Sequence, residues 1–129
     1  MSNSNIDKRY IYSEITEKII ELAIKVHKSL GPGFVEKFYE KALIHELSKN
    51  KIRYVAQKGM DVKYDDLLLG KQRVDLIIEG KVIVEIKVVS GINEVNIAQA
   101  VSYLKASGAR VGLILNFAKN KLEIKRVIL

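Results

Sequence analysis

The sequence predicts an α/β domain in which helices pack on a mixed β-sheet. Three observations lead to this fold class. Apolar residues recur at helical spacing in the N-terminal third, short apolar runs of strand length fill the centre, and one more helical pattern separates the last strands from the others. A helix between apolar strands implies a crossover, and therefore a mixed sheet. At 129 residues, the chain has the length of one domain.

Two helices are expected first. After residues 1–12, expected to be a flexible arm, helical spacing begins at Ser13, a suitable N-cap. Residues 31–33, Gly-Pro-Gly, stop this helix, because proline disfavours a helical residue before it and glycine tolerates left-handed geometry. A second helix is expected at 34–49, with an apolar face of Val35, Phe38, Tyr39, Ala42, Leu43 and Leu47.

The chain then changes to strand periodicity. Residues 52–57 and 60–64 are expected to be two strands, followed by a polar loop at Asp65-Asp66 and a turn near Gly70. Residues 72–78 and 82–88 form the strongest strand pair, joined by a turn at Glu79-Gly80-Lys81. Because both are apolar at nearly every position, we expect them at the centre of the sheet, covered on both faces.

The last third predicts one helix and two strands. Helical spacing returns at 93–107 and ends at Gly108, and strands follow at 111–116 and 122–128. The predicted order is therefore α-α-β-β-β-β-α-β-β, with the single domain covering residues 13–129.

Composition narrows the kinds of site the chain can carry. With no cysteine and two histidines, it has no disulfide, thiolate metal site, cysteine nucleophile or all-nitrogen zinc cage. Any metal is therefore expected to be a hard cation on carboxylates, magnesium or manganese. No apolar run approaches the roughly 20 residues that span a bilayer, and no secretory signal is present. We therefore expect an intracellular, cytoplasmic protein without a membrane partner.

The net charge favours a polyanionic partner. The chain has 22 Lys and Arg against 15 Asp and Glu, a formal charge of +7. Such an excess suits binding to nucleic acid through phosphate neutralisation. A solvated, lysine-rich surface is the alternative interpretation.

Three charged residues interrupt the most apolar segment. Asp75 lies within 72–78, and Glu85 and Lys87, two residues apart, share one face of 82–88. Asp75 joins that face if the turn is a three-residue loop around Gly80, and lies on the other face if the turn has two residues. On one face, two carboxylates can hold a divalent cation beside a lysine that neutralises developing charge. A buried ion pair of Lys87 with Asp75 or Glu85 is the structural alternative.

Two helical residues also bear on this site. Glu36 falls in line with Leu43 and Leu47 near the start of the second helix, where the helix dipole alone could explain a carboxylate. Gln99 lies on the helix after Lys87, where it could reach the site or belong to ordinary helix surface.

The ordered motifs resemble one protein family. Residues 33–39, Gly-Phe-Val-Glu-Lys-Phe-Tyr, resemble the motif that names the GxxExxY proteins, and the similarity spans about residues 14–128. It continues through 26–32, Arg73-Val74-Asp75-Leu76, Val84-Glu85-Ile86-Lys87, Ala98-Gln99 with Tyr103-Leu104, and 112–117. That family is similar to a branch of the PD-(D/E)xK nuclease superfamily. The resemblance implies a restriction-endonuclease-like core, α-β-β-β-α-β, on a central mixed sheet.

The resemblance also implies roles for site residues. Asp75, Glu85 and the backbone carbonyl of Ile86 would be metal ligands, and Lys87 the catalytic lysine. Glu36 would be the accessory metal-site carboxylate and Gln99 the accompanying helix residue. The sequence departs from the pattern at Val74, Ser90 and Asn96, where relatives often have proline, an acidic residue and histidine.

The resulting expectation is a magnesium- or manganese-dependent nuclease acting on DNA, with RNA less favoured. Candidate phosphate contacts, chosen only for proximity in the inferred fold, are Lys63, Lys71, Arg73, Lys105 and Arg110. One alternative is a catalytically weak or inactive module of the same fold that binds nucleic acid or a protein partner. Another is an assembly protein that forms a homodimer through an apolar sheet edge.

Overall fold

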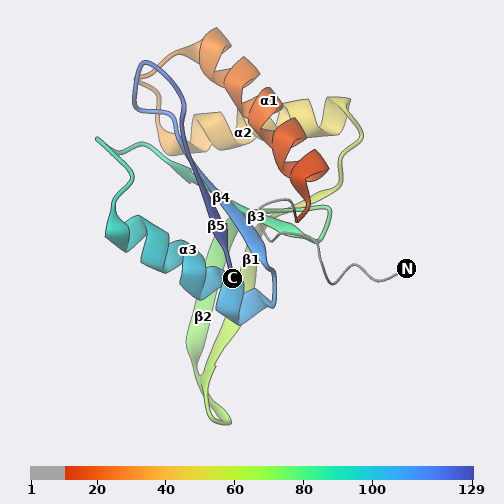
Figure 1. Cartoon of the computed structure of the whole chain (residues 1–129), viewed down its shortest axis with the longest axis vertical. Coiled ribbons are helices and arrows are strands. Elements are labelled where there is room, and N and C mark those ends of the chain that lie inside the picture. The colour runs from red at the N-terminus through yellow and green to blue at the C-terminus, as the bar shows by residue number, and fades with distance from the viewer. Residues whose placement is uncertain (1–10) are drawn as a thin grey trace.

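The computed structural model describes residues 11–129. Within this range the chain forms α1 (Ser13–Leu30), α2 (Glu36–Lys49), β1 (Tyr54–Tyr64), β2 (Leu67–Ile78), β3 (Val82–Lys87), α3 (Glu94–Ser107), β4 (Val111–Asn116) and β5 (Glu123–Ile128) (Figure 1). The five strands form one sheet in sequence order. β3 and β4 are parallel, and the other neighbours are antiparallel. The predicted mixed sheet is confirmed.

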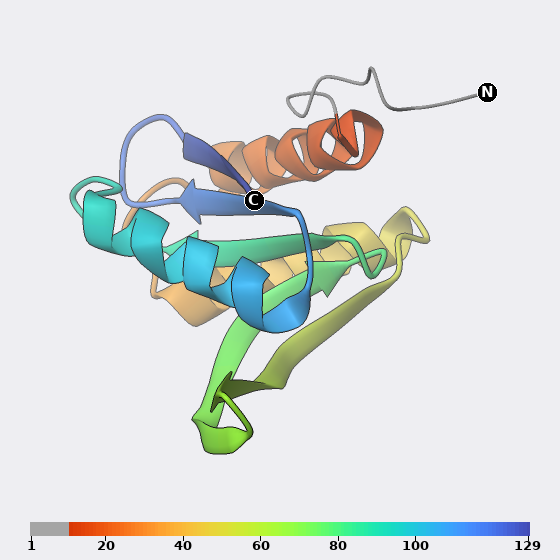
Figure 2. The same ribbon diagram turned by 60° about the horizontal axis from the view of Figure 1, so that its bottom comes forward.

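The helices cover the two faces of this sheet. Figures 1 and 2 show α1 and α2 on one face and α3 on the other. The first face holds the larger core, in which Tyr39 of α2 stacks on Phe117 at 4.5 Å between ring centroids. The second face holds a smaller core, in which Tyr103 and Leu104 of α3 pack with Ile83 and Ile114 of the sheet. The edges and ends of the two layers are where a site can reach solvent.

The strand count before α3 differs from the prediction. Residues 54–64 form one strand, β1, because Lys58 and Gly59 keep pairing with β2 where a break was expected. The turn expected near Gly70 is also absent, because Gly70 lies inside β2 and pairs with Val62. The register of β1 with β2 shifts directly after this pair, between Val62 and Lys63, as in a β-bulge. The turn at Asp65-Asp66 is confirmed as the loop between paired Tyr64 and Leu67.

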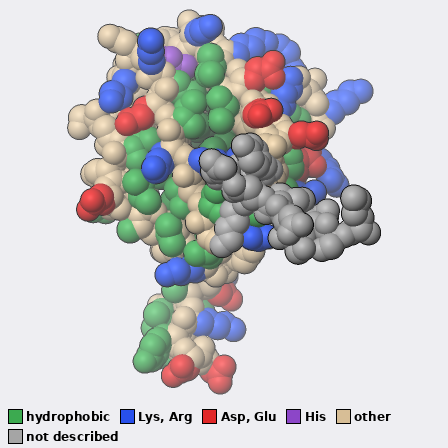
Figure 3. Space-filling model, in the orientation of Figure 1, with side chains coloured by type: hydrophobic (Ala, Val, Ile, Leu, Met, Phe, Trp, Pro, Cys, Tyr) green, Lys and Arg blue, Asp and Glu red, His purple; other side chains and the backbone are tan. Residues whose placement is uncertain are grey.

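The β1–β2 hairpin projects beyond the body of the domain (Figures 1 and 2). Its tip carries four large exposed apolar side chains, and the space-filling view shows apolar and acidic groups gathered there (Figure 3). They are Tyr64, Leu67, Leu68 and Leu69. Among residues 11–129, no helix is long and apolar enough to cross a membrane.

The start of α2 also differs from the prediction. The helix begins at Glu36, not at residue 34, and two residues assigned to its apolar face, Val35 and Phe38, are 60% and 54% exposed. The buried Tyr39 explains this arrangement. Its hydroxyl donates to the Gly31 carbonyl (2.6 Å) and accepts from the Phe34 backbone N–H (3.1 Å), which fixes the entry loop and turns the helix so that Tyr39 faces the core.

Residues 11 and 12 are tied to the core, although they belong to the expected arm. Ile11 and Tyr12 pack against the larger core, and the Ile11 carbonyl accepts a hydrogen bond from the Arg126 guanidinium. Residues 1–10 of the expected arm lie outside the described residues. Tyr12 takes the N-cap position of α1, one residue before the predicted Ser13.

The central strands show why the site has access to solvent. β3 is buried from Val82 to Ile86, as expected of a strand covered on both faces. β2 lies second from the edge and buries only alternate side chains, with Val74, Leu76 and Ile78 inside. The prediction of two-sided cover is therefore wrong for β2. Its other face remains accessible at Asp75.

Candidate functional site

The turn between β2 and β3 decides which charges share a face. Leu76 pairs with Val84 and Ile78 with Val82, so residues 79–81 form a three-residue loop. Glu79 and Gly80 both have positive φ there, 54° and 64°. This register places Asp75 opposite Glu85 and on the face that Lys87 shares. The first of the two alternatives left by the sequence is the one that occurs.

Beyond the Leu76–Val84 pair, carboxylates take over from the backbone ladder. The Asp75 N–H donates to Glu85 Oε1 (3.2 Å), and the Ile86 N–H donates to Asp75 Oδ2 (2.8 Å). The backbone pairing of β2 with β3 ends at this point, and the two side chains form the next hydrogen bonds between the strands. Each carboxylate is therefore positioned by a backbone donor of the opposite strand, and the other oxygen of Asp75, Oδ1, lies 3.4 Å from Gln57 Nε2.

Lys87 is held by α3 and not by the carboxylates. Its Nζ donates to Gln99 Oε1 (3.1 Å), and it forms no ion pair with Asp75 or Glu85. The position of Gln99 follows from a capping box at the start of α3, in which Asn93 and Asn96 bond each other's backbone N–H. Asn96, one of the departures from the family pattern, thus has a structural role.

α2 brings two further carboxylates to the site. Glu36 and Glu40 line a cavity of about 350 Å³ together with Lys37, Gln57 and Asp75. Glu36 was anticipated from the sequence, whereas Glu40 and Gln57 were not. The spacing of Glu40, four residues after Glu36, could have revealed it, because residues i and i+4 share one side of a helix. Nothing in the local pattern distinguishes Gln57.

The electrostatics of the site are those of crowded carboxylates. Burial, together with the charge of Asp75, raises the pKa of Glu85 from 4.5 to about 8. The same two causes raise the pKa of Glu36 and of Glu40. Burial, with the Glu85 and Asp75 charges, also raises the pKa of the neighbouring Tyr103 to about 12. Simultaneous ionisation of these carboxylates is therefore unfavourable in the absence of a cation.

The donor set suits a hard divalent cation. Asp75, Glu85, Glu36 and Glu40 offer only carboxylate oxygens, and none of them forms an ion pair with another described residue. Within residues 11–129, no three histidine, cysteine, aspartate or glutamate side chains converge closely enough to make a ready-made metal site. A cation drawing these carboxylates together would relieve their repulsion.

The loop after β3 is secured from β4. The buried Asn116 amide accepts from the Val89 N–H (3.1 Å) and donates to the Val89 carbonyl (2.9 Å) and to Glu123 Oε1 (2.9 Å). Glu123 also accepts from the Ile92 N–H (3.0 Å). This network holds the segment between Lys87 and α3, and so fixes how the lysine and Gln99 face each other.

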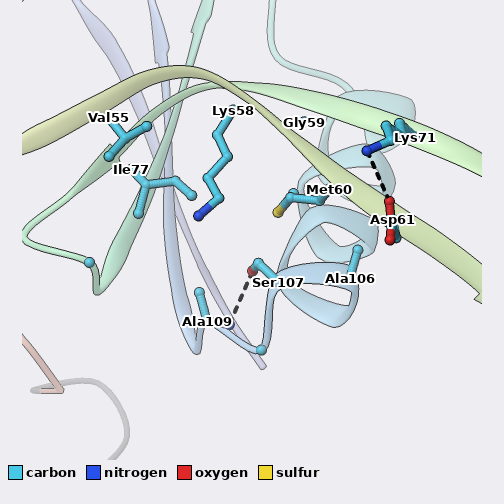
Figure 4. Close-up of a pocket in the computed structure, with 12 residues that line it drawn as sticks. Val55, Lys58, Gly59, Met60, Asp61, Lys71, Ile77, Ala106, Ser107 and Ala109 are labelled. Carbon is cyan, nitrogen blue, oxygen red and sulfur yellow. Dashed lines mark hydrogen bonds and ion pairs between the residues drawn. The ribbon is translucent and has the colours of Figure 1, made fainter.

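Two larger cavities lie between the β1–β2 hairpin and α3, and their linings do not include Asp75, Glu85, Lys87 or Gln99. Figure 4 shows one of about 600 Å³, into which Lys58 extends and where Lys71 pairs with Asp61 at 3.3 Å. The other, of about 620 Å³, is lined by Lys63 and Lys105. Three of the five predicted phosphate contacts, Lys63, Lys71 and Lys105, therefore line these two cavities.

The other two predicted phosphate contacts lie elsewhere. Arg73 is exposed on β2 and donates from Nη1 to the Gln57 carbonyl (3.2 Å), close to the carboxylates. Arg110 precedes β4, whose first residue pairs with Val82, whereas Lys87 pairs with the last residue of β4. Arg110 is thus at the opposite end of the parallel strand pair from the site.

Comparison with known proteins extends this picture. The crystal structure of SSO0001 is similar over 71% of this chain, with a TM-score of 0.58 and 17% sequence identity. At that identity the likeness concerns the fold, and the chain spans about half, 48%, of that protein's length. No curated protein matches the sequence.

A family model described as the PD-(D/E)XK nuclease superfamily matches residues 13–127. That range contains all eight helices and strands except the last residue of β5. The predicted restriction-endonuclease-like fold is confirmed by this match and by the structural similarity. The chain belongs to the PD-(D/E)XK nuclease superfamily.

Proposed function

We propose that this protein is a divalent-metal-dependent nuclease that hydrolyses phosphodiester bonds in DNA, with water as the nucleophile. The observation that supports this most is the opening between β2 and β3, where Asp75 and Glu85 lie face to face beside Lys87. Buried carboxylates destabilise a fold unless a partner compensates them. Cation binding explains why two carboxylates are buried at this position, whereas side-chain packing does not.

The residues divide between holding a cation and acting on the phosphate. Asp75, Glu85, the Ile86 carbonyl and Glu36 would hold magnesium or manganese. When bound, such a cation polarises the scissile phosphate and lowers the pKa of water. The Lys87 ammonium, whose hydrogen-bond partner among residues 11–129 is the neutral Gln99 amide, can turn toward the phosphate and neutralise the charge that develops on it. Gln99 would orient Lys87.

Nucleic acid is proposed as the substrate because lysine side chains line two cavities between the hairpin and α3, the helix that also carries Gln99. Lys63, Lys105 and Lys71 would contact backbone phosphates along α3 and the hairpin. These contacts would recognise the charge of backbone phosphates and not the base sequence, so they do not distinguish DNA from RNA. The preference for DNA over RNA rests on the proposed type of nuclease alone.

We also propose the GxxExxY branch of the superfamily. Each named position of the motif has a distinct task in the structure. Gly33 takes φ 113°, Glu36 lines the carboxylate cavity, and Tyr39 fastens the entry loop to the core. The spacing of the motif thus couples the loop, the site and the core.

Two measurements test the proposed function. Calorimetry with Mn²⁺ should show binding to the wild type and its loss in Asp75→Ala; no binding in the wild type, or equal binding in the variant, would refute the metal site. Cleavage of single-strand, duplex and branched DNA in Mn²⁺ should disappear in Lys87→Ala and persist in Lys28→Ala, a control on the exposed side of α1. Cleavage that survives Lys87→Ala contradicts the assigned roles. Nucleic acid binding without any cleavage would instead indicate an inactive module.

A further inference from the structure

Gln57 has an unusual backbone for a residue within a strand. Its φ is 54°, a left-handed conformation that residues with a Cβ rarely adopt. On either side, Ala56 pairs with Leu76 and Lys58 with Val74, and the register is the same before and after. The register does not change, but the flanking pairs pack into different cores, Ala56 and Leu76 into the larger and Val74 into the smaller. Strained backbone of this kind also clusters at ligand-binding sites.

The side chain of Gln57 contacts two carboxylates of the site. Its Nε2 donates to Glu40 Oε1 at 2.8 Å and lies 3.4 Å from Asp75 Oδ1. The first distance is that of a good hydrogen bond, and the second is at the limit. The Gln57 carbonyl is itself held by the Arg73 guanidinium at 3.2 Å. The amide is thus fixed on its backbone side and bonded mainly to Glu40.

Glu40 is a buried carboxylate with little else to compensate it. Its residue is 9% exposed, and among the described residues it forms no ion pair within 4 Å. It lies one helical turn after Glu36, and both line the cavity that Asp75 also lines. The chain could place a neutral side chain here at lower free energy. A carboxylate held toward two others suits a cation between them.

We propose that Gln57 is a positioning residue for the divalent-metal site: its strained backbone aims an amide that holds Glu40 toward Asp75, and Glu40 thereby becomes a further donor to the cation. This inference rests on the proposed metal dependence. It adds one carboxylate and one neutral residue to the site, and it gives a functional reason for the left-handed backbone of β1 at Gln57.

The test uses a substitution that separates stability from metal binding. Glycine adopts φ 54° without strain, and this gain opposes the loss of the hydrogen bond to Glu40, so Gln57→Gly should melt close to the wild-type temperature in EDTA. It should also bind Mn²⁺ about tenfold more weakly by calorimetry, the usual effect of losing a residue that orients a ligand. A lower melting temperature with unchanged Mn²⁺ affinity would show that Gln57 is only structural, and would overturn the inference.

Lys51→Gly is the matched control. Lys51 also has a positive φ, 57°, and lies after the far end of α2 from Glu36. It should relieve strain in the same way and leave the Mn²⁺ affinity unchanged. If Lys51→Gly weakens Mn²⁺ binding as much as Gln57→Gly, the effect is not specific to the site and the inference fails.

A double-mutant cycle identifies the ligand through which Gln57 acts. Glu40→Gln should weaken Mn²⁺ binding, and adding Gln57→Gly to it should weaken binding no further. Fully additive effects, or an unchanged affinity in Glu40→Gln, would refute the route through Glu40. Asp75→Ala in the same series separates the two proposals. Loss of binding there with wild-type affinity in Gln57→Gly overturns only this inference, whereas a wild type that binds no Mn²⁺ overturns both.

Discussion

A substitution at Glu85 measures how much the site lowers the free energy of unfolding in the absence of a cation. Its side chain is 5% exposed on the central strand, and burial beside Asp75 raises its pKa from 4.5 to about 8. Glutamine has the same shape, carries no charge and retains the oxygen that accepts from the Asp75 N–H. Glu85→Gln therefore mimics the protonated carboxyl at every pH. We expect this variant to be more stable than the wild type.

The size of the gain follows from proton linkage. Because the pKa is higher in the folded protein than in the unfolded chain, the folded protein keeps its proton while the unfolded chain releases it. Between pH 4.5 and 8, wild-type stability therefore falls as the pH rises, and below 4.5 the effect vanishes. At about 1.4 kcal/mol per pH unit, the loss at pH 7 is about 3 kcal/mol. For a domain of this size, that corresponds to about 10 °C in melting temperature.

The assay is thermal unfolding followed by circular dichroism in EDTA, at pH 7 and at pH 4. Glu85→Gln should melt about 10 °C above the wild type at pH 7, and the difference should close at pH 4. Saturating Mn²⁺ at pH 7 should stabilise the wild type far more than the variant, because only the wild type keeps both carboxylates. Glu17→Gln, at an exposed position of α1, controls for the loss of one negative charge.

Two results would refute this reasoning. Equal melting temperatures of wild type and Glu85→Gln at pH 7 would mean that the carboxylate is compensated in solution. A difference of the same size at pH 4 and pH 7 would mean that packing, and not the charge, separates the two proteins.

Three further predictions concern the core, the loop and the phosphate path. Phe117→Ala, which removes a fully buried ring stacked on Tyr39, should lower the free energy of unfolding in urea by about 3–5 kcal/mol; a loss below 1 kcal/mol would contradict that packing. Asn116→Ala leaves the Val89 N–H and carbonyl without their hydrogen-bond partner, so it should lower the free energy of unfolding by about 2 kcal/mol or more and speed amide hydrogen exchange at residue 89. Unchanged exchange at residue 89 would argue against the network. Lys63→Ala and Lys105→Ala should each reduce the slope of log affinity for duplex DNA against log salt by about 1, measured by fluorescence anisotropy; an unchanged slope would remove that residue from the path.

Much of the fold was predictable because its signals are local. The apolar spacing of α1 and α3, and the continuous apolar runs of β3 and β4, determine those elements without reference to distant residues. The same is true of Asp75, Glu85 and Lys87, which stand out as charges within apolar strands. Where the local signal was ambiguous, at Lys58-Gly59 and at Gly70, the strand prediction was wrong, since pairing with β2 decides those positions.

The surroundings of the site depended on contacts distant in sequence. Glu40 of α2 and Gln57 of β1 are 17 residues apart in sequence, and they meet where a left-handed backbone directs the glutamine side chain toward α2. The exposure of Phe38 likewise follows from the bonds that Tyr39 makes to the entry loop.

The sequence by itself determined that three costly charges lie in the most apolar strands of this protein. Only the tertiary structure decided that they share one face. Strand side chains alternate with a period of two, so a turn one residue shorter would have sent Asp75 to the opposite side of the sheet. Pairing of Leu76 with Val84 fixes that parity, and with it the meeting of Asp75, Glu85 and Lys87.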